Sequence, residues 1–147
     1  MADYVTHDAI LDLGNDTPED QSMNMLRFKP RGTTLVIVRS PVLPGQSLQD
    51  AVRDQMELLR RKTHSLNISG LQATRFGPDQ QMEGWEMALD FTVGKQPNVQ
   101  LQAACLIPGQ QRMLVLNYSK HGLMNNQDLQ HWRALKRGLR LTDNGAV

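Results

Sequence analysis

The chain has 147 residues, which suits one domain with one sizeable core, so we treat residues 1–147 as a single unit. Its 16 lysines and arginines nearly balance 15 aspartates and glutamates, and the net charge of +1 gives no electrostatic reason to expect nucleic acid or an acidic membrane surface as a partner. A single cysteine excludes an intramolecular disulfide framework.

The region before the first predicted helix indicates several short strands. Residues 4–13 predict one or two of them, ending at a glycine, and residues 22–28 predict another. In the latter segment Met23 and Met25 lie on one face, and apolar side chains also occupy the other. A turn that contains a glycine then leads into a strand over residues 33–39.

The strand over residues 33–39, TTLVIVR, is apolar on both faces. Leu35 and Ile37 point to one side, and Val36 and Val38 point to the other, because side chains alternate along a strand. An antiparallel strand with one face in water would carry polar residues on that face. We therefore expect a second layer or a binding partner to cover the second face.

A helix is expected to begin after Ser47, a favourable N-cap that stands three residues before Asp50. Basic residues at positions 60–62 suit its C-terminal end, where the helix dipole favours cations. Apolar residues at spacings of three and four define one face of this helix, but Gln55 places a polar amide in the middle of it. The stripe consists of Leu48, Val52, Gln55, Met56 and Leu59.

The second half of the chain predicts an antiparallel meander followed by a closing helix. Four segments with alternating patterns are separated by glycine and proline, at residues 66–77, 81–94, 97–109 and 111–122. The closing helix within residues 125–141 has apolar residues at helical spacing. We expect a frayed tail from about residue 142.

The expected fold is α+β, with a largely antiparallel, curved sheet and both helices packed on one face. The third meander segment has an apolar face, and its opposite face carries Gln100, Gln102 and Ala104, which are amides and small groups rather than charges. The face without helices would then be a concave apolar surface dotted with amides. It is not polar enough to lie open to water.

Catalytic motifs are absent from the sequence. The histidines at positions 7, 64, 121 and 131 are scattered without the spacing of a metal site, and Cys105 lies on an apolar strand face where a thiol is usually a buried hydrophobe. Neither a phosphate-binding glycine loop nor a serine nucleophile motif is present. We therefore predict a binding protein rather than an enzyme, with no cofactor and no metal.

Two interpretations of the amide-dotted face remain open. A second subunit could cover it permanently, or it could hold an apolar guest. Eight methionines favour a surface that adapts to variable apolar partners. Glutamines within such a surface could bond to the serines, threonines and exposed carbonyl groups of an apolar helix.

Several segments resemble the Eag chaperones, the effector-associated chaperones of type VI secretion systems, in the DcrB-like family. The resemblance lies in DQSMNMLRF, PGQSLQDAVRDQMELL and QLQAACLIPGQQRMLVLNYS, and it is greatest to the SciW type that serves Rhs-repeat toxins. It implies a DcrB/Mog1/PsbP-like fold. Two departures are the turn NDTPE, where many relatives have an aromatic residue, and the lack of the exported, lipidated N-terminus of the DcrB branch.

The resemblance implies a cytoplasmic homodimer that shields the N-terminal transmembrane helices of a secreted toxin. This homodimer is expected to make no stable membrane association of its own and to reach the secretion spike only through the toxin. No window approaches the about 18 apolar residues of a spanning helix. The alternative is a dimeric adaptor that binds a folded partner through its edges. The resemblance implies that Met23, Met25 and Val38 form the apolar part of the guest site, with Gln55 as its helix glutamine and either Gln100 or Gln102 as its strand glutamine. Val36 shares a strand face with Val38 and is expected to join them.

Overall fold

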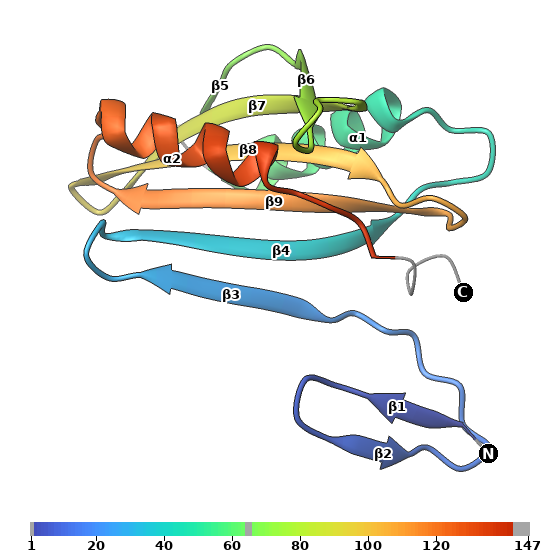
Figure 1. Ribbon diagram of the computed structural model, residues 1–147. Helices are drawn as coiled ribbons and strands as arrows, with labels where there is room; N and C mark the ends of the chain where they lie inside the picture. The colour runs from blue at the N-terminus through green and yellow to red at the C-terminus, as the bar shows by residue number, and fades with distance from the viewer. Residues whose placement is uncertain (1, 64–65, 143–147) are drawn as a thin grey trace.

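The computed structural model describes residues 2–63 and 66–142, which form two helices, a large sheet and a small hairpin (Figure 1). Most of the predicted tail, residues 143–147, lies outside the described residues. The elements are β1 (Asp3–Val5), β2 (Ile10–Asp12), β3 (Met23–Phe28), β4 (Thr33–Pro41), α1 (Leu48–Lys62), β5 (Asn67–Ile68), β6 (Gln72–Phe76), β7 (Met82–Val93), β8 (Gln96–Leu106), β9 (Arg112–His121) and α2 (Asn126–Arg137).

The main sheet has seven strands and is antiparallel throughout, which confirms the predicted α+β class. Its order is β3-β4-β9-β8-β7-β5, and β6 also pairs with β7. The long strands β7, β8 and β9 form the predicted meander, whereas β4 joins the sheet beside β9. The first two strands, β1 and β2, pair only with each other and lie beyond the β3 edge (Figure 1).

The two helices lie on opposite faces of the sheet, so the prediction that both pack on one face is wrong. Trp132 of α2 belongs to a core with Leu35, whereas Val52 of α1 belongs to a separate core with Met87. Figure 1 shows α2 in front of the strands and α1 behind them. Each face of the central sheet therefore has its own hydrophobic layer.

The strand register explains this difference. The sequence shows one apolar face on β7, marked by Trp85, and one on β8, marked by Ala103. Two helices on one side of the sheet would require both apolar faces to point to that side. In the sheet, however, Trp85 pairs with Ala104, so the two apolar faces point to opposite sides.

Both helices begin at the expected type of cap. The Ser47 hydroxyl accepts a hydrogen bond from the backbone amide of Asp50 at 3.1 Å, as predicted. At α2, Asn125 and Asp128 form a capping box, and the Lys120 ammonium lies 2.8 Å from the Asp128 carboxylate. These contacts fix where each helix starts on its face of the sheet.

Helix α2 is also held on the sheet by stacked rings and by a second ion pair. The ring of Trp132 stacks on Tyr118 at a centroid distance of 5.8 Å, and the Tyr118 hydroxyl lies 2.7 Å from His131 Nδ1. Near the end of the helix, Lys136 donates to Thr74 and pairs with Glu86. Aromatic packing and a charge-assisted bond therefore anchor this layer at two points.

Gly84 tests how tightly the strands and the α2-side core are packed. A Cβ atom at this position would overlap the Ala104 carbonyl oxygen and the Phe76 ring, because β7 passes close to both. We expect Gly84→Ala to lower the free energy of unfolding by about 2 to 3 kcal/mol, since overpacking forces the backbone to move. Urea unfolding followed by circular dichroism measures this change.

Gly70→Ala is the matched control, because a Cβ at Gly70 meets nothing within 4 Å and needs no unusual backbone conformation. Its free energy of unfolding should stay within about 0.5 kcal/mol of the parent or rise slightly. Equal effects of the two substitutions would show that the close approach at Gly84 is not a packing constraint.

Candidate functional site

Helix α1 covers only part of its face of the sheet. It lies over β7 and β8, where Val52 packs with Met87 and Leu89 in one core. On the same face, no helix or strand of the described residues covers β3 and β4 beyond α1. Met23 and Met25 of β3 remain 61% and 67% exposed there. A band of apolar sheet surface therefore lies open beside α1.

A cavity of about 290 Å³ runs between α1 and this open band. Five of its lining residues are valines and leucines, four are neutral polar residues, and Lys62 is the only charged one. We call this cavity the α1 groove. Its lining consists of Val36, Val38, Ser40, Gln55, Leu58, Leu59, Lys62, Gln102, Val115 and Asn117.

Amide side chains from three elements meet in the α1 groove. Gln55 comes from α1, Gln102 from β8 and Asn117 from β9. Within residues 2–63 and 66–142, the side chains of Gln55 and Gln102 make no hydrogen bond, so their donors and acceptors are available to a ligand. Neutral amides in apolar surroundings can bind polar groups of a largely apolar partner.

Asn117 connects the α1 groove to Gln100, which does not line it. Its Nδ2 atom donates to Gln100 Oε1 at 3.3 Å. Its Oδ1 atom is buried and has no hydrogen-bond partner in the described part of the chain. A buried acceptor without a partner is costly, and a donor from a bound molecule would remove this cost.

The predicted site residues all lie on the α1 face, although they play different parts in its geometry. Val36, Val38, Gln55 and Gln102 line the α1 groove. Met25 pairs with Val36 and Met23 with Val38 across the β3–β4 ladder, so the methionines extend the same face to the sheet edge. Gln100 stands outside the lining and contacts it through Asn117.

Several groove residues were missed by the sequence reasoning. Leu58 stands three positions after Gln55, and this helical spacing was an available signal that the two side chains are neighbours. In the structure Leu58 is 51% exposed. Val115 and Asn117 share one parity of β9, which alternates with Leu116 and Tyr118. The sequence alone did not show whether Val115 and Asn117 line the groove with Val36 and Val38 or lie under a helix.

Among the described residues, the lining of the α1 groove contains no histidine, cysteine, aspartate or glutamate. The Cys105 thiol lies in the core on the α2 side, where burial raises its pKa to about 11 and keeps it protonated. Among the described residues, no three histidine, cysteine or acidic side chains gather where they could hold a metal ion. Neither helix of the described chain is long and apolar enough to cross a membrane.

The fold and the groove define an α+β protein whose antiparallel sheet separates two cores, one of which is left partly open. The chain belongs to the DcrB family, whose family model matches residues 9–138. The family-level resemblance seen in the sequence is thereby confirmed.

A solved structure shows the same fold. The crystal structure of PA94, a protein of unknown function from Pseudomonas aeruginosa, aligns with a TM-score of 0.70 and 15% identity, covering 96% of each chain. LpqN, described as involved in cell envelope biogenesis of Mycobacterium tuberculosis, aligns with a TM-score of 0.48 and 17% identity, covering 92% of this chain and 85% of its own. Comparison with curated proteins finds no match.

The buried thiol gives a direct test of the assignment of Cys105 to the core. We expect iodoacetamide at pH 8 to leave Cys105 unmodified in the folded protein, because the thiolate is scarce when the pKa is about 11 and the side chain is 2% exposed. Mass spectrometry of the intact protein measures the modification. Unfolding in guanidinium should restore rapid alkylation. Rapid alkylation of the folded protein would contradict the burial.

Proposed function

We propose that this protein is an Eag-type chaperone that binds the N-terminal transmembrane helices of a type VI secretion toxin on its α1 face. The observation that carries the proposal is the α1 groove, in which Gln55 and Gln102 stand among valine and leucine side chains. An apolar surface with available amides suits a guest that is apolar overall but carries serine, threonine or carbonyl groups. We propose binding, without catalysis or a cofactor, as its activity.

The dimensions of the open band suit a transmembrane helix. A spanning helix of about 20 residues is about 30 Å long. Strand β4 has nine residues, which extend over about 30 Å. The cavity of about 290 Å³ takes only a few side chains. The guest helix would therefore lie along β3 and β4 and insert its larger side chains into the groove.

The open methionines suit guests of different sequence. Met23 and Met25 stand at the edge of the band on flexible, polarizable side chains. Each large apolar side chain that a guest leaves in water forfeits about 1.5 to 3 kcal/mol of burial. A chaperone that covers many of these side chains, without requiring one particular guest shape, would suppress aggregation of the toxin before export.

The cell biology of the proposal follows from the resemblance to Eag chaperones. We propose a cytoplasmic homodimer of the SciW type that serves an Rhs or PAAR toxin and contacts the secretion spike through that toxin. Helix insertion into the target membrane would release the guest, so no nucleotide is needed. A gene for a toxin with N-terminal apolar segments beside the gene for this chain would support the assignment.

Charges placed in the open band test the site. Met25→Asp and Val38→Asp should each weaken the complex with the N-terminal fragment of the neighbouring toxin by about 100-fold or more, because a buried carboxylate without a partner is very unfavourable. Co-expression followed by affinity purification and titration measures the complex. The toxin fragment should become insoluble when it is expressed with either variant.

Leu26→Asp is the matched control. Leu26 follows Met25 on β3, is 48% exposed and points to the other face of the sheet. Its variant should bind the fragment like the parent. A fragment that is soluble without this protein would sink the chaperone proposal. Loss of the homodimer in Met25→Asp or Val38→Asp would show that the band is a subunit interface. Crosslinks between the guest and the loops, away from the band, would favour a dimeric adaptor.

The amides can be tested without changing side-chain length. Gln55→Met and Gln102→Met should each weaken guest binding about three- to tenfold, because each removes hydrogen bonds worth roughly 1 kcal/mol while keeping the apolar contact. Gln100→Met should have a smaller effect, since Gln100 acts through Asn117. Isothermal titration measures the three affinities. Unchanged affinity in all three variants would mean that the guest is bound by apolar contact alone.

A further inference from the structure

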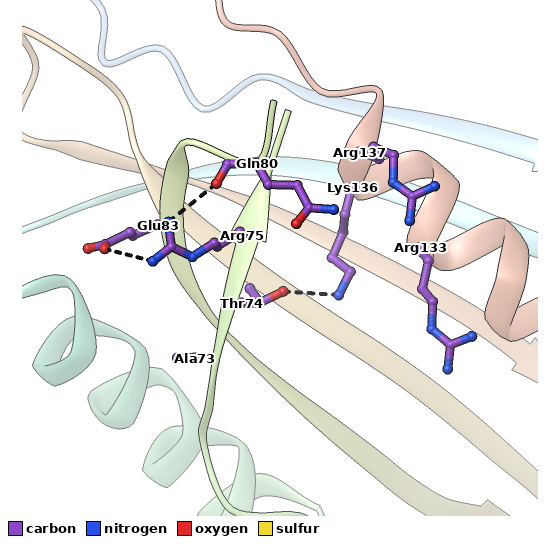
Figure 2. A pocket seen from close by; sticks show the side chains of 8 residues that line it. All are labelled: Ala73, Thr74, Arg75, Gln80, Glu83, Arg133, Lys136 and Arg137. Atoms are coloured by element: carbon purple, nitrogen blue, oxygen red, sulfur yellow. Dashed lines mark hydrogen bonds and ion pairs between the residues drawn. The ribbon is translucent and has the colours of Figure 1, made fainter. Parts of the chain in front are cut away.

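A second cleft lies on the opposite side of the sheet from the α1 groove. It has a volume of about 540 Å³ and lies between β6 and the C-terminal half of α2. Figure 2 shows Lys136 reaching from α2 toward Thr74 of β6, with Arg133 and Arg137 beside it on the same helix. The lining consists of Ala73, Thr74, Arg75, Gln80, Glu83, Arg133, Lys136 and Arg137.

The charge of this cleft stands out from the rest of the chain. Four of its lining residues are cationic and one is anionic, whereas the whole chain has a net charge of +1. Lys136 is paired with Glu86, and Arg75 lies 3.5 Å from Glu83 in an exposed pair. Over the described ranges, no carboxylate pairs with Arg133 or Arg137. Two exposed guanidinium groups therefore remain available for an anionic ligand.

The cleft also runs along an unpaired strand edge. Ala73, Thr74 and Arg75 all line it, and consecutive side chains of a strand point to opposite faces. A cavity that touches all three therefore follows the edge of β6. That strand pairs with β7 alone in the part of the chain that the structure describes. The outward backbone groups of β6 are free to bind an extended peptide.

The geometry favours an acidic peptide over a phosphate or a nucleotide. The cations come from the C-terminal half of α2, where the helix dipole is unfavourable to a compact anion, and they are spread over two elements. The eight lining residues include no aromatic ring on which a base could stack. Carboxylates spaced along an extended segment could reach the separate arginines.

We propose that the cleft between β6 and α2 binds an extended, acidic segment of a partner protein, with Arg133 and Arg137 binding its carboxylates and β6 pairing with its backbone. The site lies on the α2 side of the sheet, so it is separate from the α1 groove and does not depend on the proposed guest. Because the cations are exposed, binding weakens as the salt concentration rises.

The test uses the full chain and a fluorescein-labelled peptide of alternating glutamate and threonine. Fluorescence polarization at low salt should show binding, and a peptide with glutamine in place of glutamate should not bind. Arg133→Gln combined with Arg137→Gln should weaken binding about three- to thirtyfold, the loss expected for two exposed ion pairs. Amide resonances of residues 73–75 should shift on titration, while those of Val36 and Gln102 stay in place.

Arg60→Gln combined with Arg61→Gln is the matched control, because it removes the same charge from the last turn of α1. Its affinity should remain within about twofold of the parent. Equal weakening by the two double variants, shifts located away from β6, or no binding of the acidic peptide would each overturn the proposal. So would a ten-nucleotide poly(dT) strand that binds more tightly and loses affinity in the Arg133/Arg137 variant.

Discussion

The structure depends on a sheet whose central strands are apolar on both faces. Strand β9 contributes Leu114 and Leu116 to the core under α2, and Met113 and Val115 to the core under α1. Side-chain alternation forces this division, because neighbouring residues of one strand cannot face the same layer. Two helices on one face would leave half of these side chains in water. The placement of one helix on each face is therefore the arrangement that this strand composition requires.

The open band follows from a difference in size between α1 and its face of the sheet. The helix lies over β7 and β8, but the apolar pattern continues across β9 and β4 to the edge strand β3. On the other face, Phe28 of β3 and Ile37 of β4 pack against the α2-side core. Leu141, which follows α2, packs there too. The same strands supply both faces of the sheet, and the described chain covers the α2 face more completely than the α1 face.

Local sequence patterns predicted the elements well, because each depends on contacts within a few residues. Ser47 identified the start of α1, and the alternation over residues 81–94 identified β7. The layer arrangement could not be predicted in the same way, because it depends on the register between β7 and β8, a contact between distant segments. That Val36, Val38 and Gln102 share one face became visible only in the registers of β4 with β9 and of β9 with β8. The basic cleft was also missed, since Arg75 and Arg133 are far apart in the chain and dispersed charges give no local pattern.

The position of β9 between the two cores has a consequence for the motions of the sheet. Opening β9 would disrupt both hydrophobic layers at once, so its amide hydrogens should exchange with solvent only through near-global unfolding. Among the described strands, β3 pairs with β4 alone, and five of its six residues are exposed, so β3 can open locally at little cost. The methionine-bearing border of the open band thus belongs to the least stable part of the sheet, while its floor belongs to the most stable. The open band therefore combines a rigid floor on β9 with a labile edge strand, β3, that can adapt to the shape of a bound partner.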